Sequence, residues 1–297
     1  MGYTNLITTM YSVLTFFLKL LSYLPFRALY GISDLLYWIL YKGFHYRKDI
    51  VLINLRNSFP EKNAKEINYI CDTFYGNLCD IIIESIKMIT ISKEELMKRN
   101  DCSAHKLIDD LNAKGKTCFY FGAHLGNWEW SPAVAGLANK VPLWGVYKTV
   151  THKAFDDLLT KYRGRFGCEM IPMEQIARKA LTNKETKNIC FIADQTPSNV
   201  EANIWVNFLN QDTLAFSASA KLAKKMNAAI VYASIIKQKR GYYRYDFELL
   251  FEDPKHVDEQ EIMQTYFSRL EKDIVRDPAA WLWSHKRWKR KRVKEVN

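Results

Sequence analysis

Four short runs of apolar, β-favouring residues in the second half of the chain constrain its fold most strongly. They lie at residues 117–121, 141–147, 188–193 and 228–236. Stretches with helical periodicity separate them, at 152–165, 174–184 and 215–227. Strands that alternate with helices in this way are typical of a sheet that is buried on both faces. The sequence therefore predicts an α/β fold with a central sheet flanked by helices.

The first half of the chain has a helical pattern instead. Between Glu61 and Met88, apolar residues recur every three or four positions, which predicts a long helix. The sequence Ser92-Lys-Glu-Glu95 is typical of a capping box that begins another helix. No internal repeat and no linker divides the chain. We therefore predict one main domain over residues 42–297, with a helical part at about 42–113 and a basic tail at 285–297.

Residues 1–41 form the predicted N-terminal membrane anchor. Leu6–Leu24 is largely apolar, although Lys19 interrupts it, and it just reaches the length of about 20 residues that spans a bilayer. Phe26–Tyr41 is apolar but too short to span. We expect the anchor to be retained, because the sequence lacks the basic start and small-residue cleavage site of a signal peptide. A pair of buried core helices is the alternative. Lys42, Arg47 and Lys48 follow directly and favour a cytoplasmic location for the rest of the chain.

The chain carries a large positive charge. It has 43 Lys and Arg against 32 Asp and Glu, a net charge of +11, which favours anionic partners. The tail concentrates this charge and, beside an anchor, predicts contact with anionic membrane lipids. Nucleic-acid binding is the competing hypothesis, but the sequence lacks a recognisable RNA-recognition signature or zinc finger. The six cysteines show no metal-ligand spacing, so we expect no metal site and no disulfides.

One segment has the residues of a general-base site. Residues 119–130 predict a strand, a turn at Gly122 and a helix that begins near Gly126. On a regular helix His124 and Glu129 would lie about 140° apart, so they can meet only if His124 precedes the helix. The Glu129 carboxylate would then accept the Nδ1 proton, which leaves Nε2 free to take a proton from a hydroxyl. This spacing alone is weak evidence for a catalytic pair, and a structural histidine beside a helix N-terminal glutamate is the alternative.

The segment His124-Leu-Gly-Asn-Trp-Glu129 resembles the His-x4-acid motif of glycerolipid acyltransferases. In its full form it resembles the lipid A biosynthesis (late lauroyl/myristoyl) acyltransferase family. The similarity runs in family order from residue 54 to 289. The other matching segments are Asn54-Leu55, Phe59-Pro60-Glu61, Val146-Tyr147-Lys148, Arg163-Gly-Arg-Phe-Gly167, Ala193-Asp194-Gln195 and Trp281-Leu-Trp-Ser-His285-Lys-Arg287-Trp288-Lys289.

The resemblance implies a glycerolipid-acyltransferase-like fold with a central mixed sheet, and an O-acyltransferase in which His124 and Glu129 are catalytic. We expect Lys148 and Arg163 to bind phosphate or phosphopantetheine, because ammonium and guanidinium groups suit such oxygens. Asp194 follows a predicted strand, where α/β folds place their sites, and is expected to support the site. We expect Asn127 to bind substrate or support the site as well.

The resemblance also implies the partners. An acyl carrier protein or coenzyme A thioester would be the donor substrate, and no other cofactor is expected. The acceptor would be a lipid A precursor in lipopolysaccharide biosynthesis, with another phospholipid, aminolipid or glycolipid as the alternative. The implied location is the cytoplasmic face of a bacterial inner membrane.

Overall fold

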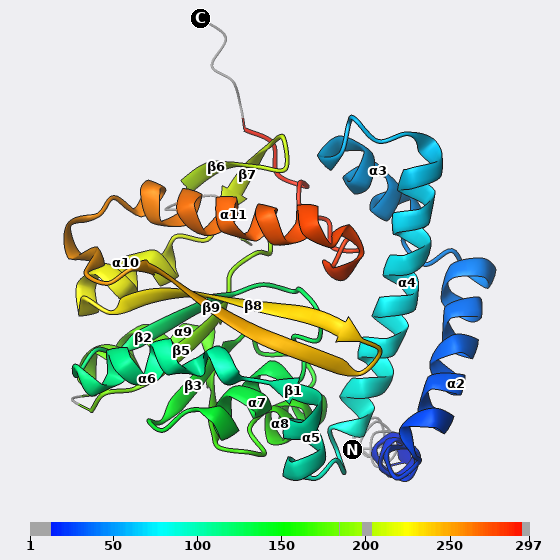
Figure 1. Ribbon diagram of the computed structural model, residues 1–297, viewed down its shortest axis with the longest axis horizontal. Helices are drawn as coiled ribbons and strands as arrows, with labels where there is room; N and C mark the ends of the chain where they lie inside the picture. Colours follow the sequence, from blue (N-terminus) through cyan, green and yellow to red (C-terminus); the bar gives the residue numbers. More distant parts are fainter. Residues whose placement is uncertain (1–12, 184, 198–203, 293–297) are drawn as a thin grey trace, which may run out of the picture.

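The computed structural model describes residues 13–183, 185–197 and 204–292 (Figure 1). Its centre is a seven-stranded sheet in the order β1-β9-β8-β2-β5-β3-β4. All neighbouring strands run parallel except β8 and β9, which are antiparallel, so the predicted mixed α/β sheet is confirmed. The strands are β1 Asn100–Asp101, β2 Cys118–Gly122, β3 Leu143–Tyr147, β4 Cys168–Pro172, β5 Asn188–Ile192, β8 Ala229–Lys239 and β9 Tyr242–Phe251.

Helices cover both faces of the sheet (Figure 1). Apolar side chains of α9, α10 and α11 pack with Phe119, Phe191 and Ile230 on one face. Those of α6 pack with Tyr120 and Val231 on the other. The helices that come after β1 in the chain are α6 Lys106–Ala113, α7 Ser131–Ala138, α8 Lys153–Arg163, α9 Met173–Thr182, α10 Ala218–Met226 and α11 Glu259–Arg276. Strands β6 Ile204–Phe208 and β7 Gln211–Ala215 form a separate hairpin.

The helical part precedes the sheet. It consists of α2 Phe26–Tyr37, α3 Lys48–Ser58, α4 Ala64–Lys87 and α5 Lys93–Arg99. The long predicted helix is α4, and it begins at a capping box formed by Asn63 and Glu66. Ser92 caps α5, because its hydroxyl accepts the backbone N–H of Glu95, but the Glu95 carboxylate binds Arg99 and does not complete the predicted capping box. Figure 1 shows α4 running along one end of the sheet, with α2 and α3 beside it.

The predicted anchor falls partly outside the described residues, which begin at 13. Residues 13–22 are helical, and α2 follows them. Within the described ranges, no helix is long and apolar enough to cross a membrane. This helical segment nevertheless exposes large apolar side chains. They include Phe16, Phe17, Leu20, Tyr23 and Leu35.

The basic tail is only partly a surface feature. Arg287 is 1% exposed and Trp288 is buried, so these two residues of the predicted membrane-contacting tail do not lie at the surface. Arg287 donates to the carbonyl of Leu214, and Trp288 donates to the hydroxyl of Thr213. Lys289 and the three residues after it are exposed, and residues 293–297 lie outside the described chain.

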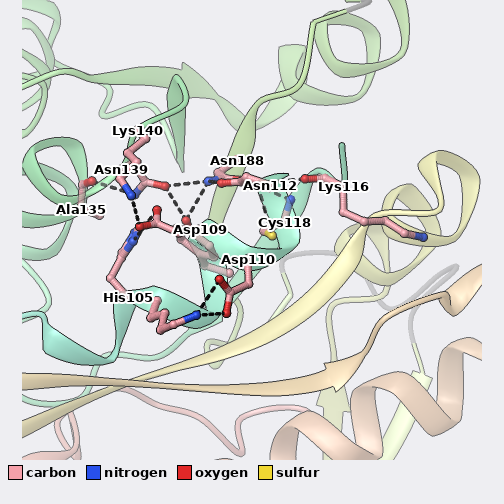
Figure 2. Close-up of polar contacts among 12 residues, drawn as sticks. His105, Asp109, Asp110, Asn112, Lys116, Cys118, Ala135, Asn139, Lys140 and Asn188 are labelled. Carbon is pink, nitrogen blue, oxygen red and sulfur yellow. Dashed lines mark hydrogen bonds and ion pairs between the residues drawn. The ribbon is translucent and has the colours of Figure 1, made fainter. Parts of the chain in front are cut away.

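A buried polar cluster fixes the amino-terminal ends of the strands (Figure 2). Asn188, the first residue of β5, is fully buried, and its amide donates to Asn112, Asn139 and Tyr120. Its oxygen accepts from Asn112 and from the backbone N–H of Cys118, the first residue of β2. Because a buried amide is costly unless it is hydrogen-bonded, these contacts align β2 with β5. The cluster therefore positions the strands whose opposite ends carry the site.

Candidate active site

His124 lies in a loop between the carboxyl end of β2 and the start of α7. Helix α7 begins at Ser131, so the prediction that it begins near Gly126 is wrong. Gly126 has φ +57°, and a Cβ atom there would lie 2.8 Å from the carbonyl oxygen of Ile235. This left-handed, tightly packed backbone cannot be the start of an α-helix. As predicted, His124 precedes the helix.

The C-terminal segment fixes this loop. The backbone N–H of Leu282 donates to the carbonyl of His124 at 3.1 Å, and that of Gly126 donates to the carbonyl of Ala280 at 3.1 Å. Leu125 and Trp281 form an antiparallel β-bridge. Backbone hydrogen bonds therefore hold the His124–Glu129 motif and the C-terminal Trp281–Lys289 motif together.

The hydrogen-bond partner of the His124 ring is Asp194. Nδ1 of His124 lies 2.7 Å from Oδ1 of Asp194, which is 2% exposed. The other carboxylate oxygen accepts the backbone N–H of His124 at 3.0 Å and Nε1–H of Trp281 at 2.8 Å. Burial by itself would raise the pKa of Asp194, but the charge and hydrogen bonds of His124, together with Trp281, hold it below its ordinary value. Asp194 is therefore a buried carboxylate that orients the imidazole.

Glu129 has a different partner. The guanidinium of Arg163 binds its carboxylate in a bidentate manner, with Nε at 3.0 Å from Oε2 and Nη2 at 2.8 Å from Oε1. Trp128 donates to the same carboxylate at 3.2 Å, and its ring packs edge-on against His124. The expected hydrogen bond from Nδ1 of His124 to Glu129 is wrong, because Asp194 occupies that position. Glu129 and His124 still line one cavity.

Asn127 is directed away from this cavity. It is fully buried, its amide donates to Oε2 of Glu84 at 2.6 Å, and its oxygen accepts the backbone N–H of Trp130. Tyr30 and Tyr243 also donate to the Glu84 carboxylate. Asn127 therefore supports the site by shaping the loop between His124 and Ser131, and the structure shows no contact with the cavity.

The cavity has a volume of about 440 Å³. Its polar wall contains His124, Glu129, Arg163 and the exposed Lys148. Most of the remaining wall is apolar, and includes Val146, Met170, Ile176, Ile192, Phe216 and Leu222. The structure thus brings four of the six predicted site residues to one cavity, with Asp194 directly behind His124.

Sequence reasoning missed three site residues. Gln195 lies with its amide nitrogen 3.1 Å from Nε2 of His124. His285 lines the cavity, and burial lowers its pKa to about 4. Trp281 anchors Asp194. All three lie in segments that had been noted for the resemblance, but nothing local marked these side chains as functional. No group of three His, Cys, Asp or Glu side chains in the described ranges could hold a metal ion.

Comparisons with known proteins show which family the chain belongs to. The family model of the bacterial lipid A biosynthesis acyltransferases matches residues 3–290. The chain is 20% identical over 250 residues to a lipid A biosynthesis palmitoleoyltransferase of Escherichia coli K12, an alignment that covers 84% of this chain and 81% of that protein. A lipid A biosynthesis acyltransferase of Shigella flexneri matches with the same identity and coverage. The model spans nearly the whole chain, so the protein belongs to the bacterial lipid A biosynthesis acyltransferase family and is an acyltransferase enzyme.

Proposed function

We propose that the protein transfers a fatty acyl chain from a carrier thioester to a hydroxyl of a lipid A precursor, with His124 as the general base. One observation carries this proposal. His124 lines a largely apolar cavity, while its Nδ1 atom is held at 2.7 Å by the buried carboxylate of Asp194. This arrangement sets the tautomer with the proton on Nδ1, so that Nε2 can accept a proton.

The reaction then needs no protein nucleophile. Nε2 of His124 takes the proton of the acceptor hydroxyl as its oxygen attacks the thioester carbonyl carbon. A carbon–oxygen bond forms, the carbon–sulfur bond breaks, and the imidazolium returns the proton to the departing thiolate. Asp194 stabilises the imidazolium while it exists, because an ionised carboxylate attracts that charge strongly in a buried position.

The pair formed by Glu129 and Arg163 supports binding of the donor. Its two side chains are about one-quarter exposed and line the cavity beside His124. Glu129 fixes the guanidinium plane, which can then present its remaining N–H groups to oxygen atoms of the thioester or of a phosphate. Lys148 at the exposed rim adds a second cation for phosphate. In this proposal Glu129, predicted to be catalytic, is a positioning residue that acts through Arg163 instead of through Nδ1 of His124.

The donor that we propose is the thioester of an acyl carrier protein. The apolar wall suits the acyl chain, because burial of each methylene contributes about 0.8 kcal/mol. An acidic carrier would be attracted by the net charge of +11. Coenzyme A would present the same thioester, so a comparison of the two donors on one purified protein decides between them.

We also propose that the enzyme works at the cytoplasmic face of the bacterial inner membrane. Residues 13–44 support this location, because they expose Phe16, Phe17, Trp38 and Phe44 together with Lys19 and Lys42. Apolar side chains mixed with cations suit a helix that lies in the headgroup region of an anionic membrane. The acceptor would then reach the site from the bilayer without crossing water.

Mass spectrometry of lipid A from a strain that lacks the gene tests the proposal. Loss of one acyl chain, restored by the wild-type gene and by His256→Ala, is the expected result, because His256 is exposed and lies outside the cavity. His124→Ala should fail to restore the chain while it accumulates to the wild-type level. An unchanged lipid A profile in the deletion strain would contradict the acceptor, and restoration by His124→Ala would contradict the base.

A further inference from the structure

A second cavity adjoins the first and shares Gln195 and His285 with it. Its volume is about 370 Å³. Part of its remaining wall comes from α4 and from the segment after α2, which do not line the first cavity. Leu78 and Ile82 come from α4, Leu40 from the segment after α2, and Leu282 from the C-terminal segment. The two cavities therefore meet at Gln195 and His285, and Gln195 lies against Nε2 of His124.

The second cavity combines an apolar wall with one cation. Arg47 is an exposed lining residue, and its Nη1 donates to the carbonyl of Ser284 at 3.1 Å, which holds the guanidinium in place. Within the described ranges no acidic side chain forms an ion pair with Arg47. A guanidinium that is fixed but unneutralised beside an apolar wall suits a phosphate group attached to hydrocarbon. Phe44 nearby in the chain is 80% exposed, so this part of the surface is already apolar.

Gln195 and His285 form the partition between the two cavities, and both side chains carry hydrogen-bonding groups that suit a hydroxyl. Nε2 of Gln195 lies 3.1 Å from Nε2 of His124 and so occupies the position from which a hydroxyl would lose its proton. Nδ1 of His285 is buried without a hydrogen-bond partner among the described residues. A buried nitrogen of this kind costs free energy until a ligand or water satisfies it. A hydroxyl that displaced Gln195 would bind Nε2 of His124.

We propose that the second cavity is the acceptor site, where a phosphate-bearing lipid lies with its hydrocarbon against Leu78 and Ile82, its phosphate on Arg47 and its hydroxyl at the partition. This inference rests on the proposed function, in which the first cavity holds the acyl thioester. Donor and acceptor then approach His124 from opposite sides of Gln195. His285 is a positioning residue for the hydroxyl, and Gln195 moves aside when that hydroxyl binds.

A binding experiment tests this site independently of acyl transfer. The full-length protein in detergent micelles is mixed with phosphatidic acid that carries a diazirine on one acyl chain, and the cross-linked peptides are mapped by mass spectrometry. We expect labelling within residues 40–47 and 78–82. A diacylglycerol with the same diazirine should label these residues about tenfold less, because it lacks the charge-assisted hydrogen bonds to Arg47. Inorganic phosphate should compete weakly, which separates a lipid site from a site for free phosphate.

Matched variants make the result specific. Arg47→Gln and Ile82→Trp should each lower labelling about tenfold, the first by removing the cation and the second by filling the cavity. Arg56→Gln and Ile53→Trp change exposed residues of α3 outside the cavity and should label like the wild type. His124→Ala should also label normally, because phosphatidic acid has no free alcohol hydroxyl to bind His124, so that a failure of the proposed chemistry leaves this outcome readable. Equal labelling of Arg47→Gln and Arg56→Gln, or labelling confined to the walls of the first cavity, would overturn the proposal.

Discussion

Asp194→Asn provides a sharp test of how His124 is oriented. In the wild type, Oδ2 of Asp194 accepts two N–H donors, from the His124 backbone and from Trp281, while Oδ1 accepts Nδ1–H. An asparagine that keeps the first two contacts must place its amide NH₂ group against Nδ1. The imidazole then has to carry its proton on Nε2, where it can no longer accept one. Since a general base contributes about 10²–10⁴-fold, turnover should fall by this factor.

The assay is single-turnover transfer of a radiolabelled acyl group from its carrier to the lipid acceptor. Asp194→Asn in a His124→Ala background should cause little further loss, because both changes remove the same function. Glu129→Gln and Arg163→Gln should likewise be non-additive with each other, since the structure joins them as a bidentate pair. This assignment would be refuted if Asp194→Asn kept wild-type turnover while Glu129→Gln lost all activity and Arg163→Gln did not. Glu129 would then be the residue that orients His124.

Three further predictions concern the membrane, the tail and pH. Phe16→Glu combined with Phe17→Glu should release the protein from sedimented membranes, and unchanged sedimentation would exclude these side chains from the contact. Replacing the charges of Lys289–Arg292 with Gln should weaken binding to anionic vesicles by about 1 kcal/mol per charge near the surface, and high salt should have the same effect if the contact is electrostatic. Burial raises the pKa of Glu84 from 4.5 to about 7, so the stability that its protonated form contributes is present below pH 4.5 and lost as the pH rises through 7. In urea unfolding, the stability of the wild type relative to Glu84→Gln should therefore decrease between pH 5 and pH 8, and a constant difference would show that Glu84 does not titrate there.

The elements that the sequence predicted well are those whose environment is uniform. Strands β2, β3, β5 and β8 are buried along most of their length, so each reads as a continuous apolar run. Strand β9 was missed because it alternates charged residues with aromatic ones and pairs antiparallel with β8. Strand β4 was missed because its five residues contain Glu169 and end at Pro172. Such strands are specified by their neighbours more than by their own composition.

The sequence predicted part of the site, including His124, Glu129 and Asp194, but not how these residues pair. His124 and Glu129 are neighbours in sequence, and spacing alone cannot show which carboxylate reaches Nδ1. That choice depends on the parallel pairing of β2 with β5, which brings Asp194 to the carboxyl end of β2. Backbone contacts of the C-terminal segment add Trp281 and His285 from about 160 residues further along the chain. Long-range contacts of this kind leave no periodic signal in the sequence.

Hydrogen bonds and opposite charge explain how Asp194 can remain ionised behind the histidine. A carboxylate that is 2% exposed loses most of its hydration, and this cost is large unless hydrogen bonds and opposite charge replace the water. Its three N–H donors supply the hydrogen bonds. Burial lowers the pKa of Arg287 to about 10, which still leaves the guanidinium charged at neutral pH, and its attraction to Asp194 opposes that lowering. The charge and hydrogen bonds of His124, together with the hydrogen bond from Trp281, hold the pKa of Asp194 below its ordinary value despite its burial. An ionised Asp194 at this position can stabilise the imidazolium that forms when His124 takes the proton of the acceptor.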